Sequence, residues 1–578
     1  MLNARLYRTS WIVAVVALVV ALLTLEAPPA SPEPGRQGDV DGAAALELAR
    51  QLNGVAPERP AGSAADQRAA EWVRARFEDV PGDAEVQSQE FAARTDNGRV
   101  TLENVYLVVP GAGDDADRGG VLVVAPRDTP EGVRAGASGT ALMLLAANLL
   151  ATTAHDRPFL FVSTDGSTVG NAGIRWFLSR FSSFPIDAAV VLDDPGASLG
   201  NEVHLWSRGT DGAAALGLAR IASDTAEPLV SDPEPSLGSQ LLALAVPQTF
   251  GDQGPVVAEG ISAVTISNRG DSPLRAAPEA TAERMTQTGN ALMRLLGAVD
   301  TSLELPSPTR AIALGGRDLR PAIARVILLL LALPVLVSAV DVVARMRRGH
   351  VPLAPGARAL GGRIVPALVV VAAGYALVLA GLLPGTAAGA PPLPDDVPFD
   401  ARAGLGLALV AAAAAVAWAL MRRRGLGVSA PSEAAAALVV LAGLLVLAWI
   451  VRPYELVLVL PAAHAALLAT AARHRAQVVA LVLLAMTPLL ALAIVLADHL
   501  DRNPLFASWY AYATSVAGAR GPVGVVLGPV LAACVWSVAA LVVFRARKGL
   551  VATGSRQPSR RGSRRDRTRA PRPASRRW

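Results

Sequence analysis

The sequence is poor in the residue types that build soluble metal-binding or disulfide-bonded proteins. Only 17% of its 578 residues are charged, whereas a soluble globular protein has about 25%. Its single cysteine, Cys534, excludes a disulfide framework and any cysteine-based zinc site. Its six histidines exclude a histidine-rich metal protein. Hydrophobic residues make up 52% of the chain and the mean hydropathy is +0.40, so the composition indicates a membrane protein.

Lysine is also almost absent, and the positive charge that remains is concentrated at the C-terminus. Lys548 is the sole lysine, which together with abundant alanine and glycine is typical of bacterial coding bias. Residues 545–578 hold twelve arginines, Lys548 and one acid, a net charge of +12; since the whole chain carries +5, the remainder carries −7. We expect residues 546–578 to be a disordered cytoplasmic tail that binds anionic lipid, at up to about 1 kcal/mol per basic residue. The tail has almost no aromatic residues to stack on bases, so nucleic acid is not an expected partner.

Apolar segments of membrane-crossing length occur at the N-terminus and again after residue 320. Residues 1–26 contain the run Trp11–Leu25, which predicts an uncleaved transmembrane anchor, with a signal peptide as the alternative. Residues 27–39 are rich in proline and predict a linker. Residues 321–545 hold seven further apolar stretches, each near the about 20 residues that a bilayer requires. These stretches are 326–344, 364–383, 403–421, 434–451, 455–472, 476–497 and 523–544.

Arginine is concentrated in alternate connections between these stretches. The connections after the first, third and fifth stretches are rich in arginine, and so is the tail, whereas the others carry aspartates such as Asp395 and Asp498. The positive-inside rule places the arginine-rich connections and both termini in the cytoplasm, and residues 27–320 outside. The sequence therefore predicts a multi-pass plasma-membrane protein with about eight transmembrane helices. The lipid bilayer is its first expected partner.

Residues 40–310 have a different pattern, which is typical of a soluble α/β domain. Segments with helical periodicity alternate with short β-branched runs, and this alternation predicts a sheet covered by helices on both faces. The expected helices are 43–52, 64–77, 139–152 and 170–181. The expected strands are 100–109, 121–125, 159–163, 188–192 and 263–266.

Several motifs of this domain occur in the order and at the spacing of the M28 zinc-peptidase family. They are Arg59-Pro60-Ala61-Gly62-Ser63, Ala137-Ser138-Gly139-Thr140, Asp165-Gly166, Leu192-Asp193-Asp194-Pro195-Gly196 and Gly251-Asp252-Gln253-Gly254-Pro255. On these motifs the domain resembles M28 peptidases. The resemblance implies a mixed sheet flanked by helices, and a site where two histidines and three carboxylates hold two zinc ions while a glutamate activates water.

Most of the positions that the resemblance assigns to this chemistry hold other residues. The first histidine, the bridging aspartate, the adjacent glutamate pair and the last histidine are replaced by Pro126, Ala135, Ser167, Thr168 and Gln253. Asp193 alone keeps the identity of a ligand, and Asp128 matches the acid that would orient the missing first histidine. Because zinc needs three or four donors, we expect no metal and no catalysis by the family mechanism.

The polar residues around these positions still predict a vestigial cleft. We expect them to gather near the carboxyl ends of strands, where open α/β sheets bind ligands. The expected members are Asp128, Ser138, Asp165, Ser167, Thr168, Asp193, Asp194, Asp252 and Gln253. A solvated acidic cleft, or residues that only cap helices, are the alternatives. The two histidines of the domain, His155 and His204, are expected to be solvated.

In the membrane half His464 is the clearest candidate for a functional residue. It lies mid-span, three residues after Pro461, and ionisable groups inside a bilayer usually mark function. A histidine hydrogen-bonded to a neighbouring helix is the equal alternative. The segment 498–521 is expected to be an external loop that is long enough to touch the soluble domain. Its Asp498-His499-Leu500-Asp501 motif could ligate a metal, but we expect His499 to lie at an exposed helix end.

The order of an anchor, an external M28-like domain and seven spans resembles the attachment subunit of the GPI transamidase. This layout implies a non-catalytic subunit that binds a protein or lipid-linked substrate and works with another membrane protein or enzyme subunit. Two alternatives stay open. One is an active membrane-bound zinc aminopeptidase with a relocated site, and the other is a transporter or lipid-handling protein centred on His464.

Overall fold

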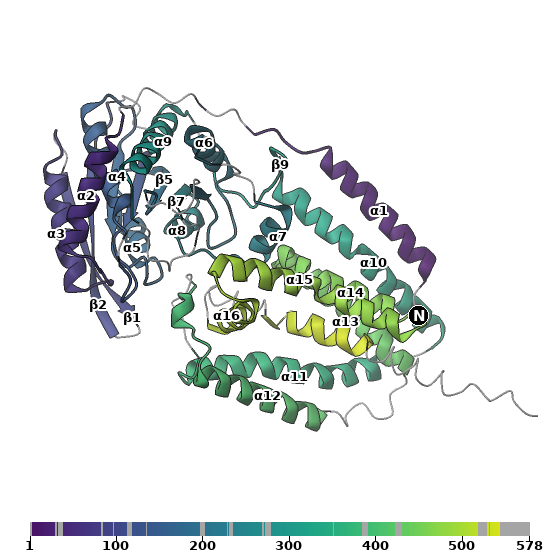
Figure 1. Ribbon diagram of the computed structural model, residues 1–578. Coiled ribbons are helices and arrows are strands. Elements are labelled where there is room, and N and C mark those ends of the chain that lie inside the picture. Colours follow the sequence, from purple (N-terminus) through teal and green to yellow (C-terminus); the bar gives the residue numbers. More distant parts are fainter. Residues whose placement is uncertain are drawn as a thin grey trace, which may run out of the picture.

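The computed structural model describes residues 3–543 apart from several segments. Those segments are 29–31, 33–38, 83–84, 96–97, 113–117, 135, 197–202, 228, 231–234, 269–270, 272–278, 304, 351, 384–390, 422–429, 518–528 and 531. The molecule is elongated, with an α/β half at one end and a helical half at the other (Figure 1). The basic tail predicted for residues 546–578 lies outside the described residues.

A mixed sheet of seven strands in the order β1-β2-β4-β3-β5-β7-β6 forms the α/β half. The pairs β3–β4, β3–β5 and β5–β7 are parallel, whereas β1–β2, β2–β4 and β6–β7 are antiparallel. The strands are β1 (Glu85–Thr95), β2 (Gly98–Val109), β3 (Gly120–Pro126), β4 (Phe159–Thr164), β5 (Ile186–Asp193), β6 (His204–Trp206) and β7 (Ser262–Ser267). The mixed sheet agrees with the α/β class that the sequence predicts.

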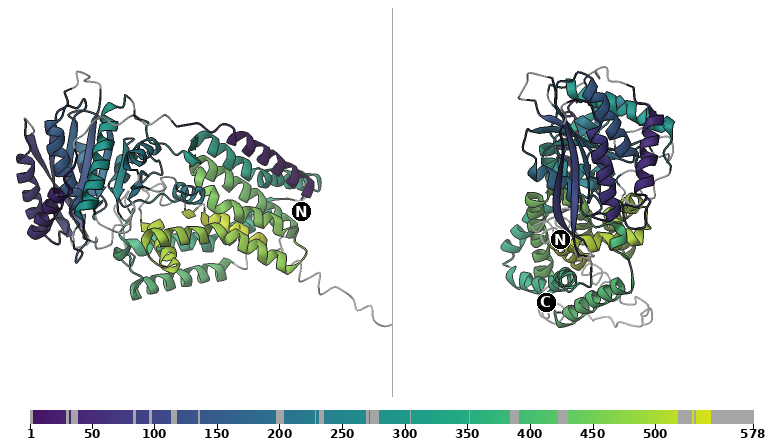
Figure 2. Two further views of the ribbon diagram at one scale, coloured as in Figure 1. Left: turned by 45° about the horizontal axis from the view of Figure 1, so that its top comes forward. Right: turned by 90° about the vertical axis from the view of Figure 1, so that its left-hand side faces the viewer.

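Helices cover both faces of this sheet (Figure 2). They are α2 (Gly42–Val55), α3 (Ala64–Glu78), α4 (Ser138–Thr152), α5 (Ala172–Arg180), α6 (Leu216–Ala226), α7 (Leu237–Ala245), α8 (Gln253–Ala258) and α9 (Ala282–Thr301). Along β3 the buried side chains alternate: Val121 and Val123 belong to the core formed with α2, α3, α4, α6 and α9, whereas Leu122 and Val124 pack with α5 and α8. This two-residue alternation is why continuous apolar strands are buried on both faces.

All the expected helices and strands of the domain are present, with small shifts at their ends. Ser63, the last residue of the first M28-like motif, caps α3, because its side chain accepts a hydrogen bond from the backbone of Asp66. β1, β6 and the helices α6 to α9 were not predicted from the sequence. The edge strand β1 is polar and largely exposed, so it lacks the apolar run by which the central strands were recognised.

The helical half contains six described helices that are long and apolar enough to cross a membrane. They are α1 (Ala4–Leu22), α10 (Pro321–Arg348), α11 (Ala354–Leu379), α12 (Ala401–Met421), α13 (Ala430–Val451) and α15 (Arg475–Leu500). The stretch expected at 455–472 forms the shorter α14 (Leu456–Ala469), and the stretch expected at 523–544 lies partly outside the described residues. Six of the eight expected spans therefore have membrane-crossing length in the described chain.

A short two-stranded hairpin lies between the halves. The hairpin of β8 (Ile312–Leu314) and β9 (Arg317–Leu319) leads into α10. Glu26, which lies just after α1, pairs with the backbone of Asp318 and with the side chain of Arg320.

Residues 498–521 were expected to form a loop. This expectation is wrong for Pro504–Ala517, which form α16, because the aromatic side chains Trp509 and Tyr510 pack into a buried core.

Candidate functional site

A small pocket lies at the carboxyl ends of the parallel strands β3, β4 and β5. Because these strands run in the same direction, the residues that follow them meet at one edge of the sheet. The pocket has a volume of about 80 Å³, well below the roughly 300–1,000 Å³ of sites that hold small molecules. Six expected cleft residues line it: Asp128, Ser167, Thr168, Asp193, Asp194 and Asp252. The other three, Ser138, Asp165 and Gln253, are buried beside it and do not line it.

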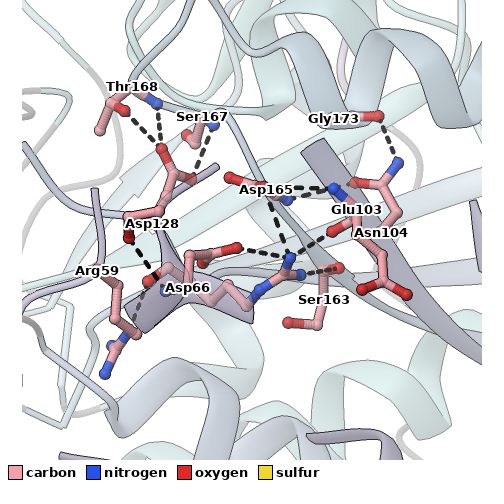
Figure 3. Close-up of polar contacts among 12 residues, drawn as sticks. Arg59, Asp66, Glu103, Asn104, Asp128, Ser163, Asp165, Ser167, Thr168 and Gly173 are labelled. Carbon is pink, nitrogen blue, oxygen red and sulfur yellow. Dashed lines mark hydrogen bonds and ion pairs between the residues drawn. The ribbon is translucent and has the colours of Figure 1, made fainter. Parts of the chain in front are cut away.

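Asp128, which follows β3, holds the turn after β4. Its carboxylate accepts hydrogen bonds from the backbone nitrogens of Ser167 and Thr168, both at 2.8 Å, and from the Thr168 hydroxyl at 2.6 Å (Figure 3). Burial raises the pKa of Asp128. The residue that matches an orienting acid in the M28 resemblance is therefore a capping residue here.

Asp252 is fully buried and is engaged by three donors. It accepts from the Thr164 hydroxyl at 2.9 Å, the Ser167 hydroxyl at 3.0 Å and the Asn171 amide at 2.9 Å. Burial raises its pKa to about 6. Ser167 thus bonds to Asp252 through its side chain, and Asn171 reaches it from a left-handed backbone conformation with φ 56°.

Asp194 and Ser138 form a second buried pair on the other side of the pocket. The backbone and hydroxyl of Ser138 donate to one oxygen of Asp194 at 3.2 and 2.6 Å, and the hydroxyl accepts from the backbone of Gly196 at 3.0 Å. Asp193 lies on the pocket wall, 3.4 Å from the hydroxyl of Ser267. These contacts tie the end of β5 to the start of α4.

Gln253, at the position of the last M28 histidine, is buried between two threonines. Its amide nitrogen donates to Thr249 at 2.7 Å, and its amide oxygen accepts from Thr265 at 2.6 Å. Both polar ends of the side chain are therefore used inside the protein.

The guanidinium group of Arg127 is buried among carboxylates and carbonyls below the pocket. It donates to Asp66 at 2.9 Å, to the carbonyl of Ser163 at 3.0 Å and to the carbonyl of Glu103, and it lies 3.8 Å from Asp165. Neither Arg127 nor Asp66 exposes its side chain. Burial raises the pKa of Asp165 to about 9, and Figure 3 shows it beside Asn104, away from Ser167 and Thr168.

A second buried arginine, Arg59, comes from the first M28-like motif. It donates to the carbonyls of Arg127, Ala56 and Gly136 at 2.7, 2.9 and 2.7 Å. Burial lowers its pKa to about 10. The motif that resembles M28 peptidases therefore fixes the loops beneath the pocket.

These residues do not fit a two-zinc site. Asp128 and Asp252 already accept three hydrogen bonds each, and a buried guanidinium lies beside Asp165. Within the described ranges, no group of three or more histidine, cysteine, aspartate or glutamate side chains is placed to hold a metal. The bridging position, Ala135, lies outside those ranges.

His464, the membrane candidate, links three helices. Its Nδ1 lies 3.1 Å from the Tyr7 hydroxyl of α1 and its Nε2 lies 2.9 Å from the Leu331 carbonyl of α10. Its ring also packs on Trp11, with centroids 5.2 Å apart. Both ring nitrogens are therefore engaged by neighbouring helices, as the alternative interpretation of this residue expects.

The histidines of the α/β half differ from each other. The prediction of a solvated loop is wrong for His155, which is buried against Phe159 and has its Nδ1 2.8 Å from the Arg157 carbonyl. His204 lies exposed on β6, as expected. The turn around His155 is polar, so its sequence predicts exposure. The burial of His155 depends on packing between distant segments, which a local pattern does not show.

The residues that join the two halves could not be named from the sequence. His499, expected at an exposed helix end, has a side chain only 18% exposed, lies 3.6 Å from Asp271 and packs against the rings of Trp206 and Phe250. Gln248 donates to Thr514 of α16 at 3.3 Å. The length of the segment and its aromatic residues were the available signal, and the segment, which was expected to be long enough to touch the soluble domain, does contact it.

The fold and the site define an α/β domain with a small, internally hydrogen-bonded cleft, joined to a bundle of apolar helices. No protein-family model matches the chain, and no curated protein matches it. Among solved structures, a glutaminyl cyclase from an Acidobacteriales bacterium is similar at 18% identity and a TM-score of 0.37, over 47% of this chain and 99% of that one.

Two aminopeptidases give similar values. A zinc aminopeptidase from Bacillus subtilis is 13% identical with a TM-score of 0.37, over 50% of this chain and all of that one. An aminopeptidase from Aneurinibacillus sp. is 11% identical with the same TM-score, over 46% and 95% of the two chains. With identities below 25% and TM-scores below 0.5, these likenesses define neither the activity nor the substrate of this chain.

Proposed function

We propose that this protein is a membrane-anchored M28-like pseudopeptidase, in which the α/β domain is a non-catalytic binding or scaffold module. The observation that carries the proposal is that side chains of the cleft are hydrogen-bonded to other residues of the domain. Asp128, Asp252 and Gln253 direct their polar atoms at neighbouring residues of the same domain. A metal ion or a reactive water would have to displace those bonds, each worth about 1 kcal/mol net and more where a carboxylate accepts.

The proposal extends to placement and partners. The arginine-rich connections favour cytoplasmic termini and an extracytoplasmic α/β domain in a multi-pass plasma-membrane protein of bacterial type. A non-catalytic domain on a membrane bundle acts through what it binds, so its partner is a protein or lipid-linked substrate, another membrane protein or an enzyme subunit.

The first test is the metal content of the full chain, purified in detergent and dialysed, by inductively coupled plasma mass spectrometry. We expect near-zero zinc per chain. We also expect no hydrolysis of aminoacyl-4-nitroanilides and no cyclisation of peptides with N-terminal glutamine, whether zinc is added or chelated. Hydrolysis of aminoacyl substrates is the reaction expected of the alternative, an active zinc aminopeptidase.

Two variants sharpen this test. Asp193→Ala removes the retained ligand identity, and Asp79→Ala removes a carboxylate with a side chain 68% exposed on the surface. One or two zinc ions per chain, lost in Asp193→Ala and kept in Asp79→Ala, together with hydrolysis that chelation abolishes, would overturn the proposal and establish the aminopeptidase.

A further inference from the structure

A groove on the outside of the helical half runs between α10 and α13. Its volume is about 800 Å³. At one end the two helices are tied together, because the Nε1 of Trp449 donates to the Arg325 carbonyl at 2.8 Å. The groove lies toward the other end, where both of its walls are apolar. The wall residues are Leu336, Ala339, Val340, Val343 and Ala344 of α10 and Val439, Ala442, Gly443 and Val446 of α13.

The walls of this groove are exposed although they are apolar. Val340 is 69% exposed and Val446 is 38% exposed, whereas Val335 and Leu441 of the same two helices are buried in the bundle core. Because α10 and α13 are long and apolar enough to cross a bilayer, we expect the exposed faces to meet lipid.

The length of the groove fits one leaflet of a bilayer. Leu336 and Arg347 are eleven residues apart, which is about 16 Å along a helix. This is half of the hydrocarbon core of a membrane, which is about 30 Å thick, whereas a partner helix that crosses the membrane needs about 20 residues. The groove therefore suits an acyl chain better than a helix of another protein.

Two arginines close the groove at the end of α10. Arg347 continues the face that carries Val340 and Val343, since residues three and four apart share one side of a helix. Arg347 and Arg348 both line the groove and both are exposed. The Nε of Arg348 donates to the Ala344 carbonyl at 3.3 Å, and neither guanidinium forms an ion pair with a carboxylate of the described residues. A ligand in the groove thus meets two cations at the end of an apolar channel.

The charges around this end of the bundle favour an anion. Asp341 is paired with Arg345 at 2.6 Å, and Glu433 is buried. The connections that follow α10, α12 and α14 hold arginine and histidine but no acid, so the residues there that the structure does not describe add no negative charge. These connections are 349–353, 422–429 and 470–474.

A second groove shows that apolar walls alone do not select a headgroup. It lies between α1 and α10, has a volume of about 680 Å³ and is lined by residues such as Val16 and Val326. No charged side chain is among its lining residues in the described chain. Of the two grooves, the one between α10 and α13 combines a channel for an acyl chain with cations for a phosphate.

We infer that the groove between α10 and α13 binds an acidic phospholipid. One acyl chain lies along Val340, Val343 and Val446, and the phosphate accepts hydrogen bonds from Arg347 and Arg348. Hydrogen bonds between guanidinium and phosphate are charge-assisted and strong, and basic pockets between membrane helices bind anionic headgroups. The lipid belongs to the leaflet on the arginine-rich side, and calling this leaflet cytoplasmic rests on the topology proposed above.

The experiment counts the lipids that the full chain retains in detergent, by native mass spectrometry, with dioleoyl phosphatidylglycerol or dioleoyl phosphatidylcholine. Gly443→Leu fills the groove without a clash, because a Cβ at Gly443 meets no atom within 4 Å. Gly404→Leu on α12 is the matched control, since its Cβ is equally free and the residue does not line the groove. Losing the contact of about two methylene groups lowers retention about tenfold.

A second pair of variants tests the phosphate contact. The double variant Arg347→Gln and Arg348→Gln removes both guanidinium groups from exposed positions, so it keeps the fold if Gly443→Leu does not. The double variant Arg473→Gln and Arg475→Gln removes the same charge from exposed positions beside the start of α15, outside the groove. The basic tail is present in every variant, so any lipid that it binds cancels in the comparison.

The inference predicts selective retention of phosphatidylglycerol, lowered about tenfold in Gly443→Leu and in the Arg347 and Arg348 variant and unchanged in both controls. Equal retention by Gly443→Leu and the wild type places the lipid elsewhere and overturns the site. Equal losses in the two arginine variants, or equal retention of phosphatidylcholine, overturn the choice of headgroup.

The same spectra test the other occupant of the groove. A dimer that Gly443→Leu dissociates would place a second copy of the chain there and overturn the lipid site. Lipid retention in detergent depends neither on zinc, on hydrolysis nor on orientation in a membrane, so this inference and the proposed function fail separately.

Discussion

The cleft at the strand ends and a cavity at the junction of the two halves differ in volume and in the pairing of some of their polar side chains. In the cleft, Asp128 and Asp252 accept three internal hydrogen bonds each around a pocket of about 80 Å³. At the junction, the Nε1 of Trp206 and the Oε1 of Gln248 are covered by the protein and make no hydrogen bond among the described residues, beside a cavity of about 580 Å³. Paired polar groups stabilise a fold, whereas a buried polar group without a partner costs about 1–3 kcal/mol.

Residues that the M28 resemblance singles out hold loops together in this domain, as Arg59 and Asp128 do. At the contact with the helical half, Trp206 Nε1 and Gln248 Oε1 make no hydrogen bond among the described residues. Substitutions of the paired side chains of the cleft should therefore cost stability, whereas removing an unpaired polar atom at the junction should cost little.

Arg127→Met is the change with the largest expected effect. It leaves Asp66 and Asp165 buried without their cation, and breaking a buried pair in this way costs about 3–5 kcal/mol. The free energy of unfolding of the full chain in detergent, from denaturant titration followed by tryptophan fluorescence, measures this. Arg68→Met, an exposed arginine on the helix that carries Asp66, is the control and should be nearly neutral. A loss below about 1 kcal/mol for Arg127→Met would show that the cleft network is not structural.

The second-largest expected effect is the pH dependence of stability that Asp252 causes and that Asp252→Asn removes. Burial raises the folded-state pKa of Asp252 from 3.8 to about 6, so the carboxyl stabilises the fold when protonated, and this contribution is lost as pH rises through 6. One pKa unit corresponds to about 1.4 kcal/mol, so between pH 4 and 6 the wild type should lose up to about 3 kcal/mol relative to Asp252→Asn.

Thermal unfolding of both proteins across this pH range measures the difference. Asp128 and Asp165 also have raised pKa values, but they are present in both proteins and cancel in the comparison. Parallel curves for the two proteins would contradict the assignment of this pH dependence to Asp252.

The sequence predicted the central part of the fold because its strands are continuous apolar runs. β3, β4, β5 and β7 are buried on both faces, so each appears as such a run. The edge strand β1 and the amphipathic α16 were missed, since their patterns depend on neighbours that are distant in the chain. In the membrane half, hydropathy predicted that helices are present, but it did not predict that α14 is shorter than a membrane span.

The members of the cleft were predictable in the same way, but their partners were not. Parallel strands bring Asp128, Ser167 and Asp193 to one edge of the sheet. That Asp128 caps the turn of Ser167 depends on β3 and β4 being neighbours, which the sequence alone does not fix. The junction depends on contacts between segments almost 300 residues apart, such as Trp206 and His499, which no local pattern predicts.

The smallest expected effect on stability belongs to Trp206→Phe, and it is the most direct test of the comparison. Trp206 Nε1 makes no hydrogen bond within the described chain, so removing it should change the free energy of unfolding of the full chain in detergent by less than about 0.5 kcal/mol. Trp509→Phe is the matched control, because the Nε1 of that buried residue donates to the Val397 carbonyl at 3.1 Å. Its loss leaves a buried acceptor and should cost about 1–3 kcal/mol. Equal losses in the two variants would mean that the Trp206 indole already has a partner in the protein, and the contrast between the paired carboxylates of the cleft and the unpaired indole at the junction would then fail.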